Sequence, residues 1–262
     1  MPNTKTPPHR RARRRHLRKK LTMLACGITL GVGGMGASSK ATGTSSARTP
    51  AKNAGVNVGR AAWSKLNIEG PRPQVVDLAL SAASCAIRSG MVDQPKTLTI
   101  IDYSKSSTER RLWVMDFADG SMLRHELVAH GQGSGGDVAN VFSNTPDSHQ
   151  SSLGLFVTAD TYVGKNGYSL RLDGLDTGFN DRARERAIVI HGAPYVSERV
   201  AKAQGRLGRS WGCPALGDDV ARDVIEEIKG GNLVFAYYPD QSWLNGSPLL
   251  RACNARPDVA GD

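Results

Sequence analysis

The sequence is poor in cysteine and lacks the residue patterns that bind metals or phosphates. Four cysteines among 262 residues are too few for a disulfide-dense scaffold. No spacing of His, Cys and Asp makes a credible metal site, and no glycine loop of the phosphate-binding type occurs. We therefore expect no metal and no cofactor. The length is enough for one mid-sized domain with a proper core.

Acidic residues are missing from the first twenty positions, which hold nine of the 34 lysines and arginines. The remaining basic residues number 34 less nine, or 25, against 24 acidic ones, so the rest of the chain has a net charge of +1. The formal net charge of +10 therefore reflects one terminal segment. A nearly neutral body gives no compositional support for a nucleic-acid partner.

A long apolar run is also missing. The most apolar stretch, residues 21–37, contains five glycines and is short for a membrane span, which needs about 20 apolar residues. Preceded by basic residues and followed by Ser38 and Ser39, it predicts an export signal at 1–37, with a membrane anchor as the alternative. We expect a protein of the periplasm or cell envelope without a stable membrane span. The small polar residues of 38–70 predict a flexible linker.

The cysteines outside the export signal are Cys85, Cys213 and Cys253, because Cys26 lies within it. An odd number in an oxidising compartment indicates one pair and one free thiol. We expect a Cys85–Cys253 disulfide and a free Cys213. The alternative is three free thiols, with Cys85 a small apolar residue on a helix face.

Short apolar segments dominate the rest of the chain and predict a mainly β fold, a β-sandwich or open barrel. Helical spacing predicts one N-terminal helix from Pro73 to Gly90, and one helix in the C-terminal half, at 218–229. Asp119-Gly120 predicts a hairpin. We expect one catalytic domain at 71–245 and a tail at 246–262. Strands are predicted at 97–103, 111–117, 122–129, 154–158, 168–172, 187–191 and 233–238.

Two segments carry residues suited to acyl transfer. Ile188-Val189-Ile190-His191-Gly192 places a histidine at the end of an apolar strand, and residues 205–214 form a glycine-rich loop that ends in Ser210-Trp211-Gly212-Cys213-Pro214. A histidine can activate a thiol and later protonate a leaving amine. The Gly192 carbonyl would orient this histidine, and the N–H groups of residues 211–213 would form an oxyanion hole.

A structural interpretation competes with the catalytic one. Cysteine is often simply buried, and a histidine after three aliphatic residues is often part of a core. The surrounding glycines and Pro214 favour a surface loop, where functional residues concentrate.

The spacing of His191-Gly192 and Ser210-Trp211-Gly212-Cys213 resembles the L,D-transpeptidase (YkuD-like) catalytic domain, in particular the murein L,D-transpeptidase subfamily. Residues 151–156 resemble the segment that precedes a strand in this family. The resemblance implies a β-rich domain in which Cys213 is the nucleophile, His191 the base and Gly192 the orienting carbonyl. Ser210 and Gly212 would shape the active-site loop.

The resemblance also implies a substrate. Such enzymes release D-Ala from the third residue of a peptidoglycan stem peptide, usually diaminopimelate, and pass the acyl group to an amine of a neighbouring stem, giving a 3→3 crosslink. Here Trp211 replaces a frequent histidine and Ala215 a frequent Asn or Arg. These two departures put the substrate contacts of the family in question, although not the nucleophile.

Further side chains are candidates for substrate binding. An arginine presents a bidentate fork to a carboxylate, which makes Arg209 the leading candidate beside the motif. His130, followed by Gly131, repeats the pattern of a strand that ends in His-Gly. The other candidates are Tyr168, Arg171, Arg184 and Arg206.

Three other functions remain open. An L,D-carboxypeptidase would use the same site with water as acceptor, and a non-catalytic wall-binding module would use Cys213 structurally. A papain-like peptidase is disfavoured, since there the cysteine precedes the histidine. We expect a monomer that binds stem peptides.

Overall fold

The computed structural model describes residues 70–254, with side chains described as far as Ala252. The predicted export signal, Cys26 and nearly all of the predicted linker lie outside these residues. Every helix within the described part is too short or too polar to cross a membrane.

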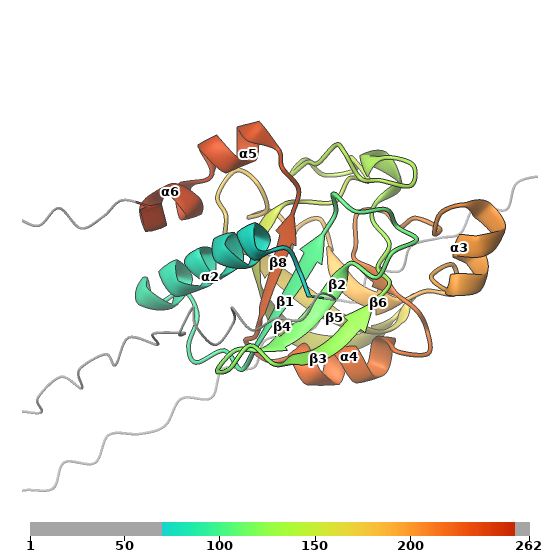
Figure 1. Cartoon of the computed structure of the whole chain (residues 1–262), viewed down its shortest axis with the longest axis horizontal. Coiled ribbons are helices and arrows are strands. Elements are labelled where there is room, and N and C mark those ends of the chain that lie inside the picture. The colour runs from blue at the N-terminus through green and yellow to red at the C-terminus, as the bar shows by residue number, and fades with distance from the viewer. Residues whose placement is uncertain (1–69, 255–262) are drawn as a thin grey trace, which may run out of the picture. The chain divides into compact units, whose positions relative to one another are not determined.

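Eight strands form a single mixed sheet in the spatial order β3-β2-β1-β8-β4-β5-β6-β7 (Figure 1). The mainly β fold predicted from the sequence is confirmed. The strands are β1 (Thr97–Asp102), β2 (Leu112–Asp116), β3 (Met122–Glu126), β4 (Gly154–Gly164), β5 (Gly167–Gly174), β6 (Val189–Gly192), β7 (Ala215–Leu216) and β8 (Leu233–Tyr237).

The centre of the sheet is its most apolar part. β1 and β8 are buried along their whole length and pair in parallel, with Leu98 opposite Leu233. Strands covered on both faces are expected to be continuous apolar runs, as these are. The cover comes from α2 (Pro73–Arg88), which packs on β1, β4 and β8, and from α4 (Ala221–Ile228), which packs on β1, β5 and β6.

The hairpin predicted at Asp119-Gly120 joins β2 to β3. Gly120 has a φ of +74°, and Asp116 Oδ1 accepts a hydrogen bond from the Ala118 N–H at 2.8 Å. Strand β3 ends at Glu126, three residues earlier than predicted, and Ala129 instead forms an isolated bridge with Ala215 of β7. This bridge connects the two ends of the sheet, so the sheet nearly closes into a barrel.

The helices of the C-terminal half are more numerous than predicted. The predicted helix at 218–229 is α4, but three further short helices occur in the described part: α3 (Glu198–Gln204), α5 (Gln241–Gly246) and α6 (Pro248–Asn254). Local caps define α3 and α5, through Ser197 Oγ and Asp240 Oδ1. Caps are a weaker sequence signal than apolar periodicity. Residues 248–254 of the predicted tail form α6, which packs on α2.

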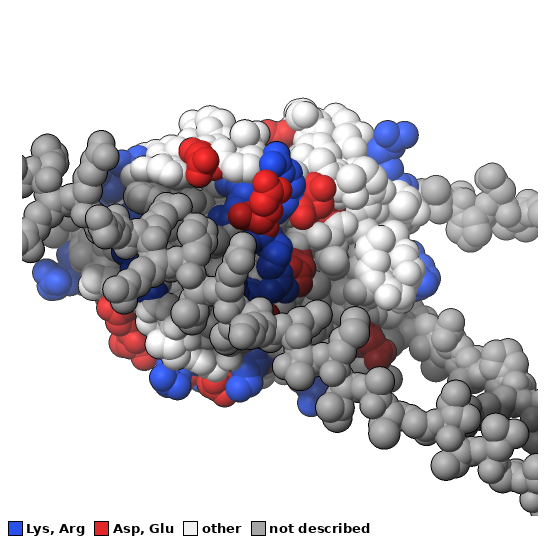
Figure 2. All heavy atoms as spheres, turned by 180° about the vertical axis from the view of Figure 1, so that it is seen from behind, with Lys and Arg blue, Asp and Glu red and all other residues white. Residues whose placement is uncertain are grey.

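Charged side chains of both signs lie next to one another on the face seen in Figure 2. Exposed ion pairs among the described residues include Arg184 with Asp173 at 2.6 Å and Arg182 with Glu185 at 2.8 Å. This interleaving agrees with the nearly neutral composition of the chain beyond residue 20.

A small second core lies beside the main one. Its buried members include Ala193, just after β6, and Ala215 of β7, with Tyr195 packed against them. The strand that carries His191 and the strand that follows Cys213 therefore have apolar support of their own. The other members are Leu127, Ala129, Val196, Ala201 and Leu207.

Candidate active site

His191 and Cys213 are brought together by the pairing of β6 with β7. The two strands run parallel with His191 opposite Ala215, two residues after Cys213. On its other side His191 pairs with Ser169 of β5. His191 is 4% exposed and Cys213 is 9% exposed, so both side chains are buried by the surrounding structure.

The His191 ring has a defined proton arrangement. Its Nδ1 lies 2.8 Å from the Gly192 carbonyl oxygen. A carbonyl only accepts, so Nδ1 carries the hydrogen and Nε2 has the free lone pair of a general base. Burial lowers the pKa of His191, against the opposing effects of the Gly192 carbonyl and the charge of Asp218. The ring is therefore neutral near pH 7.

The Cys213 thiol is protonated in the resting site. Burial raises its pKa above the ordinary 9.0, whereas the Val189 N–H, the charge of Arg186 and the backbone N–H of Cys213 act in the opposite direction. The thiol donates to the Ala187 carbonyl, with Sγ 3.7 Å from the oxygen. Ala187 has a φ of +53°, a left-handed conformation that costs a non-glycine residue about 1–2 kcal/mol. Such strain is often stored at functional sites.

Arg186 is a component of the site that the sequence did not single out. Its guanidinium donates to the carbonyls of Ser143 and Gln150, both at 2.6 Å, and to the hydroxyls of Ser148 and Ser152 at 3.2 and 2.6 Å. It thus fastens the 143–152 loop and also brings a positive charge near Cys213. Three arginines alternate at 182, 184 and 186, and nothing in the sequence distinguishes the half-buried one.

Ser210 closes the loop that leads to Cys213. Its hydroxyl donates to the Cys213 carbonyl at 2.6 Å and accepts the Gly212 N–H at 3.1 Å. The expectation that the Gly212 N–H belongs to an oxyanion hole is therefore wrong, because Ser210 already takes up that donor. Among the described residues no backbone or side-chain acceptor binds the N–H of Trp211 or that of Cys213. Two of the three expected donors remain.

Gly212 is required at its position for two reasons. Its φ is +113°, and an alanine Cβ there would lie 2.7 Å from the Gln150 carbonyl oxygen. The 205–213 loop and the 143–152 loop therefore touch through their backbones at this glycine.

Trp211 belongs to the 205–213 loop and lies on the surface, with 67% of the residue exposed. Its ring stacks on His149 with centroids 4.7 Å apart and planes 9° from parallel. His149 itself has a φ of +54° and accepts a hydrogen bond on Nδ1 from Gln132 Nε2 at 2.9 Å. A stacked pair of aromatic rings, Trp211 and His149, thus occupies the place where the family resemblance implied a single histidine at position 211.

The predicted substrate-binding arginines are engaged elsewhere. Arg209 donates to the Gly135 carbonyl at 2.7 Å, and Arg206 to the Leu207 carbonyl at 2.9 Å. Arg171 pairs with Asp160 at 3.0 Å, and Arg184 with Asp173. Their guanidinium groups bind backbone carbonyls and surface carboxylates.

Tyr168 does not point its hydroxyl at the thiol. The hydroxyl donates to Glu226 of α4, and Arg222 lies over the ring, 4.7 Å from its centroid. Tyr195, which the sequence did not suggest as a site residue, packs against the small core that contains Ala215, two residues after Cys213. Burial, together with the charges of Cys213 and Asp218, raises its pKa to about 12.

The His130 side chain is buried in the interior, and its backbone carbonyl accepts the Ser210 N–H of the 205–213 loop. Its Nδ1 accepts from Arg111 Nη2 at 2.8 Å, and its Nε2 has no hydrogen-bond partner among the described residues. Burial and the neighbouring Arg111 lower its pKa to about 4. Arg111 is itself fully buried and also donates to the Val128 and Lys105 carbonyls at 3.0 and 2.7 Å. Only the fold brings this pair together.

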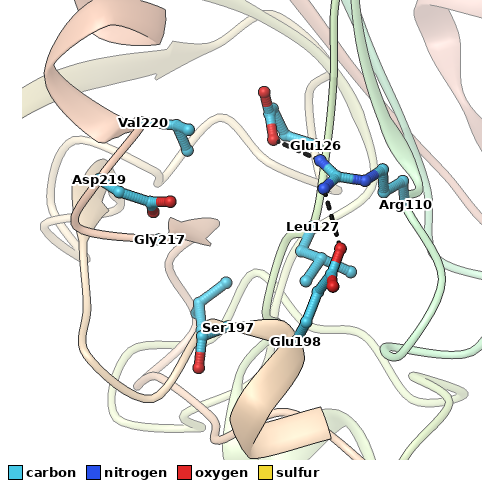
Figure 3. Close-up of a pocket in the computed structure, with 9 residues that line it drawn as sticks. Arg110, Glu126, Leu127, Ser197, Glu198, Gly217, Asp219 and Val220 are labelled. Atoms are coloured by element: carbon cyan, nitrogen blue, oxygen red, sulfur yellow. Dashed lines mark hydrogen bonds and ion pairs between the residues drawn. The ribbon is translucent and has the colours of Figure 1, made fainter.

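A pocket of about 270 Å³ lies away from Cys213 (Figure 3). Arg110 forms one wall and is paired with Glu126 at 2.8 Å and Glu198 at 3.1 Å, while Asp219 points in from the opposite side. Neither His191 nor Cys213 lines it, and its arginine is already neutralised. Its volume alone does not make it the active site.

The cysteines of the described part divide as the sequence suggested. Cys213 is free, whereas Cys85 on α2 is disulfide-bonded. The side chain of Cys253 lies outside the described residues, so its pairing with Cys85 stays a prediction. Between residues 70 and 252, no group of His, Cys, Asp and Glu side chains is arranged to hold a metal ion.

Comparison with known proteins gives a family match. The model of the L,D-transpeptidase catalytic domain matches residues 68–237, whereas no curated protein matches the chain. Among solved structures, an L,D-transpeptidase from Mycobacterium smegmatis is similar, with 15% identity over 55% of this chain and a TM-score of 0.35. This chain spans 59% of the length of that protein.

Two further solved structures are similar at the same level. The first is the K307A mutant of the helical cell shape determining protein Pgp2 from Campylobacter jejuni, with 13% identity, coverage of 66% of this chain and 58% of that one, and a TM-score of 0.37. The second is the L,D-transpeptidase (residues 123-326) from Xylanimonas cellulosilytica, with 16% identity, coverage of 64% and 70%, and a TM-score of 0.33.

Proposed function

The chain belongs to the L,D-transpeptidase catalytic domain family, and we propose that it is a peptidoglycan L,D-transpeptidase that carries the acyl group on Cys213. The observation that carries the proposal is the free thiol two residues from the register partner of His191, whose Nδ1 is held by the Gly192 carbonyl. This leaves Nε2 as the base for the adjacent nucleophile.

In the first half-reaction, His191 Nε2 takes the proton of the Cys213 thiol as the sulfur attacks the carbonyl carbon of the third stem residue. The N–H of Cys213 stabilises the negative oxygen of the tetrahedral intermediate. The C–N bond to the terminal D-Ala then breaks, and His191 returns the proton to the leaving amine. A thioester and free D-Ala result.

In the second half-reaction, an amine of a neighbouring stem attacks the thioester carbon. His191 accepts a proton from this amine and passes it to the departing sulfur. A new amide forms and the thiol is restored, which gives a 3→3 crosslink. Because His191 and the Cys213 thiol are both neutral before the reaction, the thiolate and the imidazolium form only when the sulfur attacks the substrate.

Two alternatives use the same surface. If water replaces the acceptor amine, the product is a tripeptide and the enzyme is an L,D-carboxypeptidase. A non-catalytic wall-binding module would need no reactive thiol. Incubation with purified muropeptides separates these functions, because dimers indicate transfer, tripeptides indicate hydrolysis, and unchanged substrate indicates binding alone.

The central test is the intact mass of the protein before and after exposure to a carbapenem. The Cys213 sulfur attacks the lactam carbonyl, the ring C–N bond breaks and the nitrogen takes the proton, so one whole carbapenem mass is added. We expect this adduct in the wild type and none in Cys213→Ala with an unchanged circular dichroism spectrum. An unmodified wild type, or an adduct that persists in Cys213→Ala, would rule out the assignment.

The proposal includes the place of action. An enzyme of the wall works outside the cytoplasm, which agrees with the export signal predicted at 1–37 and with a disulfide at Cys85. We propose an exported monomer of the periplasm or cell envelope, with stem peptides as partners and without a cofactor.

A further inference from the structure

We infer that Ser151 is a positioning residue that aims the backbone N–H of Cys213 at the developing oxyanion. Ser151 is 1% exposed and lies on the 143–152 loop, far from Cys213 in the sequence. It touches neither the thiol nor the proposed substrate, so its action would pass through the peptide bond that precedes Cys213. The inference rests on the proposed acyl transfer.

The Ser151 hydroxyl has a single consistent set of hydrogen bonds. It donates to the Gly212 carbonyl at 3.0 Å and accepts the Gly131 N–H at 3.0 Å. A hydroxyl has one hydrogen, and that of Ser151 is directed at the Gly212 carbonyl, so its direction is fixed. Tyr103 lies beside Ser151, since both residues line the same small cavity.

The next step follows from peptide geometry. In a planar trans peptide the N–H points opposite to the preceding carbonyl. Because Ser151 holds the Gly212 carbonyl on the buried side, the Cys213 N–H must point away from that side. This N–H belongs to the same residue as the attacking sulfur, so a substrate carbonyl attacked by that sulfur would lie within its reach.

The support behind Ser151 is rigid. The Ser134 hydroxyl accepts the Ser151 N–H at 2.8 Å, which fixes the backbone. Tyr103 is 1% exposed and lies under the Arg111 guanidinium, whose Cζ is 5.3 Å from the ring centroid. Burial raises the pKa of Tyr103 to about 12, so its phenol stays protonated and can donate. The buried arginine thus holds in place the tyrosine that lies beside Ser151.

Two reactions of Cys213 separate positioning from general structural support. Acylation by a carbapenem passes through a tetrahedral oxyanion, whereas alkylation by iodoacetamide displaces iodide without one. In Ser151→Ala the Gly212 carbonyl loses its buried donor and the Cys213 N–H loses its orientation. We expect the acylation rate to fall about 10²-fold, the lower end of the effect of removing one oxyanion donor. The alkylation rate should stay within about threefold, because the thiol itself is untouched.

Three further variants complete the experiment. Ser151→Thr keeps the hydroxyl, and the cavity of about 10 Å³ lined by Tyr103, Ser151 and Gly212 leaves some room for its methyl group, so it should restore acylation. Tyr103→Phe removes a hydroxyl from the residue beside Ser151 and keeps both hydrogen bonds of Ser151, so it should give a smaller loss than Ser151→Ala. Ser247→Ala is the matched control. Its buried hydroxyl also donates a hydrogen bond, to Asp176, and accepts one, from the Leu250 N–H. Neither partner belongs to the 143–152 loop or the 205–213 loop.

The outcomes are distinguishable. Equal losses of acylation and alkylation in Ser151→Ala, or a similar acylation loss in Ser247→Ala at matched melting temperature, would reduce Ser151 to a structural residue. Unchanged acylation in Ser151→Ala would overturn the inference while leaving the proposed function intact. A wild-type protein that alkylates but is never acylated would contradict both.

Discussion

At the scale of single residues, the site combines a neutral histidine with a protonated thiol. Burial dominates both, lowering the pKa of His191 and raising that of Cys213. Proton transfer between them is therefore coupled to attack on the substrate. A cysteine protease with a preformed thiolate–imidazolium pair has the opposite arrangement.

This difference predicts a pH profile. The thiolate fraction grows as pH rises through the raised pKa, so the rate of Cys213 alkylation by iodoacetamide should climb with a midpoint above pH 9.0. Turnover instead needs neutral His191, whose lowered pKa puts the acid limb of kcat/KM below pH 6.5. A flat alkylation rate across neutral pH would reveal an ion pair and contradict the assignment.

Gly212 predicts a second residue-scale result. Gly212→Ala adds both left-handed strain and a clash with the Gln150 carbonyl, so acylation should be lost and unfolding should need less denaturant. Gly178→Ala is the control, since Gly178 has a φ of +85° with nothing within 4 Å of the added Cβ. It should cost only about 1–2 kcal/mol and retain acylation. Equal effects of the two variants would mean that the clash is unimportant.

At the scale of elements, the loop at 143–152 is as much a part of the site as the strands. The 143–152 loop contacts the 205–213 loop through Gln150 and Ser151. The Arg186 guanidinium donates hydrogen bonds that hold the 143–152 loop in place. Four hydrogen bonds from one guanidinium replace the regular hydrogen bonds that a loop lacks.

Arg186→Lys tests that role. A lysine keeps the positive charge but cannot span the two carbonyls and two hydroxyls. We expect faster proteolysis within 143–150 and a loss of about 2–3 kcal/mol in the free energy of unfolding, the scale of a lost charged hydrogen bond. Arg182→Lys is the control, because Arg182 is exposed and pairs only with Glu185 on the surface. Unchanged protease sensitivity in Arg186→Lys would contradict the role.

The elements also show what sequence patterns can predict. Apolar periodicity located α2 and α4, and β-branched runs located β1 and β8, because burial itself imposes those patterns. The short α3 and α5 depend on single capping side chains and were missed. His191 and Cys213 stood out because glycine and proline surround them. Ser151, Tyr103, Arg111 and Arg186 act only through tertiary contacts, so no local pattern marks them.

At the scale of the whole molecule, α2 packs on the domain and its Cys85 is disulfide-bonded. The predicted partner, Cys253, lies on α6, which packs against α2. Peptide mapping of the unreduced mature protein should find the Cys85 peptide joined to the Cys253 peptide and only Cys213 alkylated. Recovery of an alkylated Cys253 peptide would exclude the pairing. The same map after reduction should show all three alkylated, which controls for accessibility.

The burial of Cys213 has a consequence for the chemical stability of its thiol at the location proposed above. Peroxides and disulfides react with exposed thiolates, and the oxidation that follows ends in irreversible acids. A thiol that is 9% exposed and held as S–H against the Ala187 carbonyl offers them little to attack. The burial that delays ionisation until substrate arrives therefore also suits the free Cys213 thiol to the oxidising surroundings proposed for this protein, in which Cys85 is disulfide-bonded.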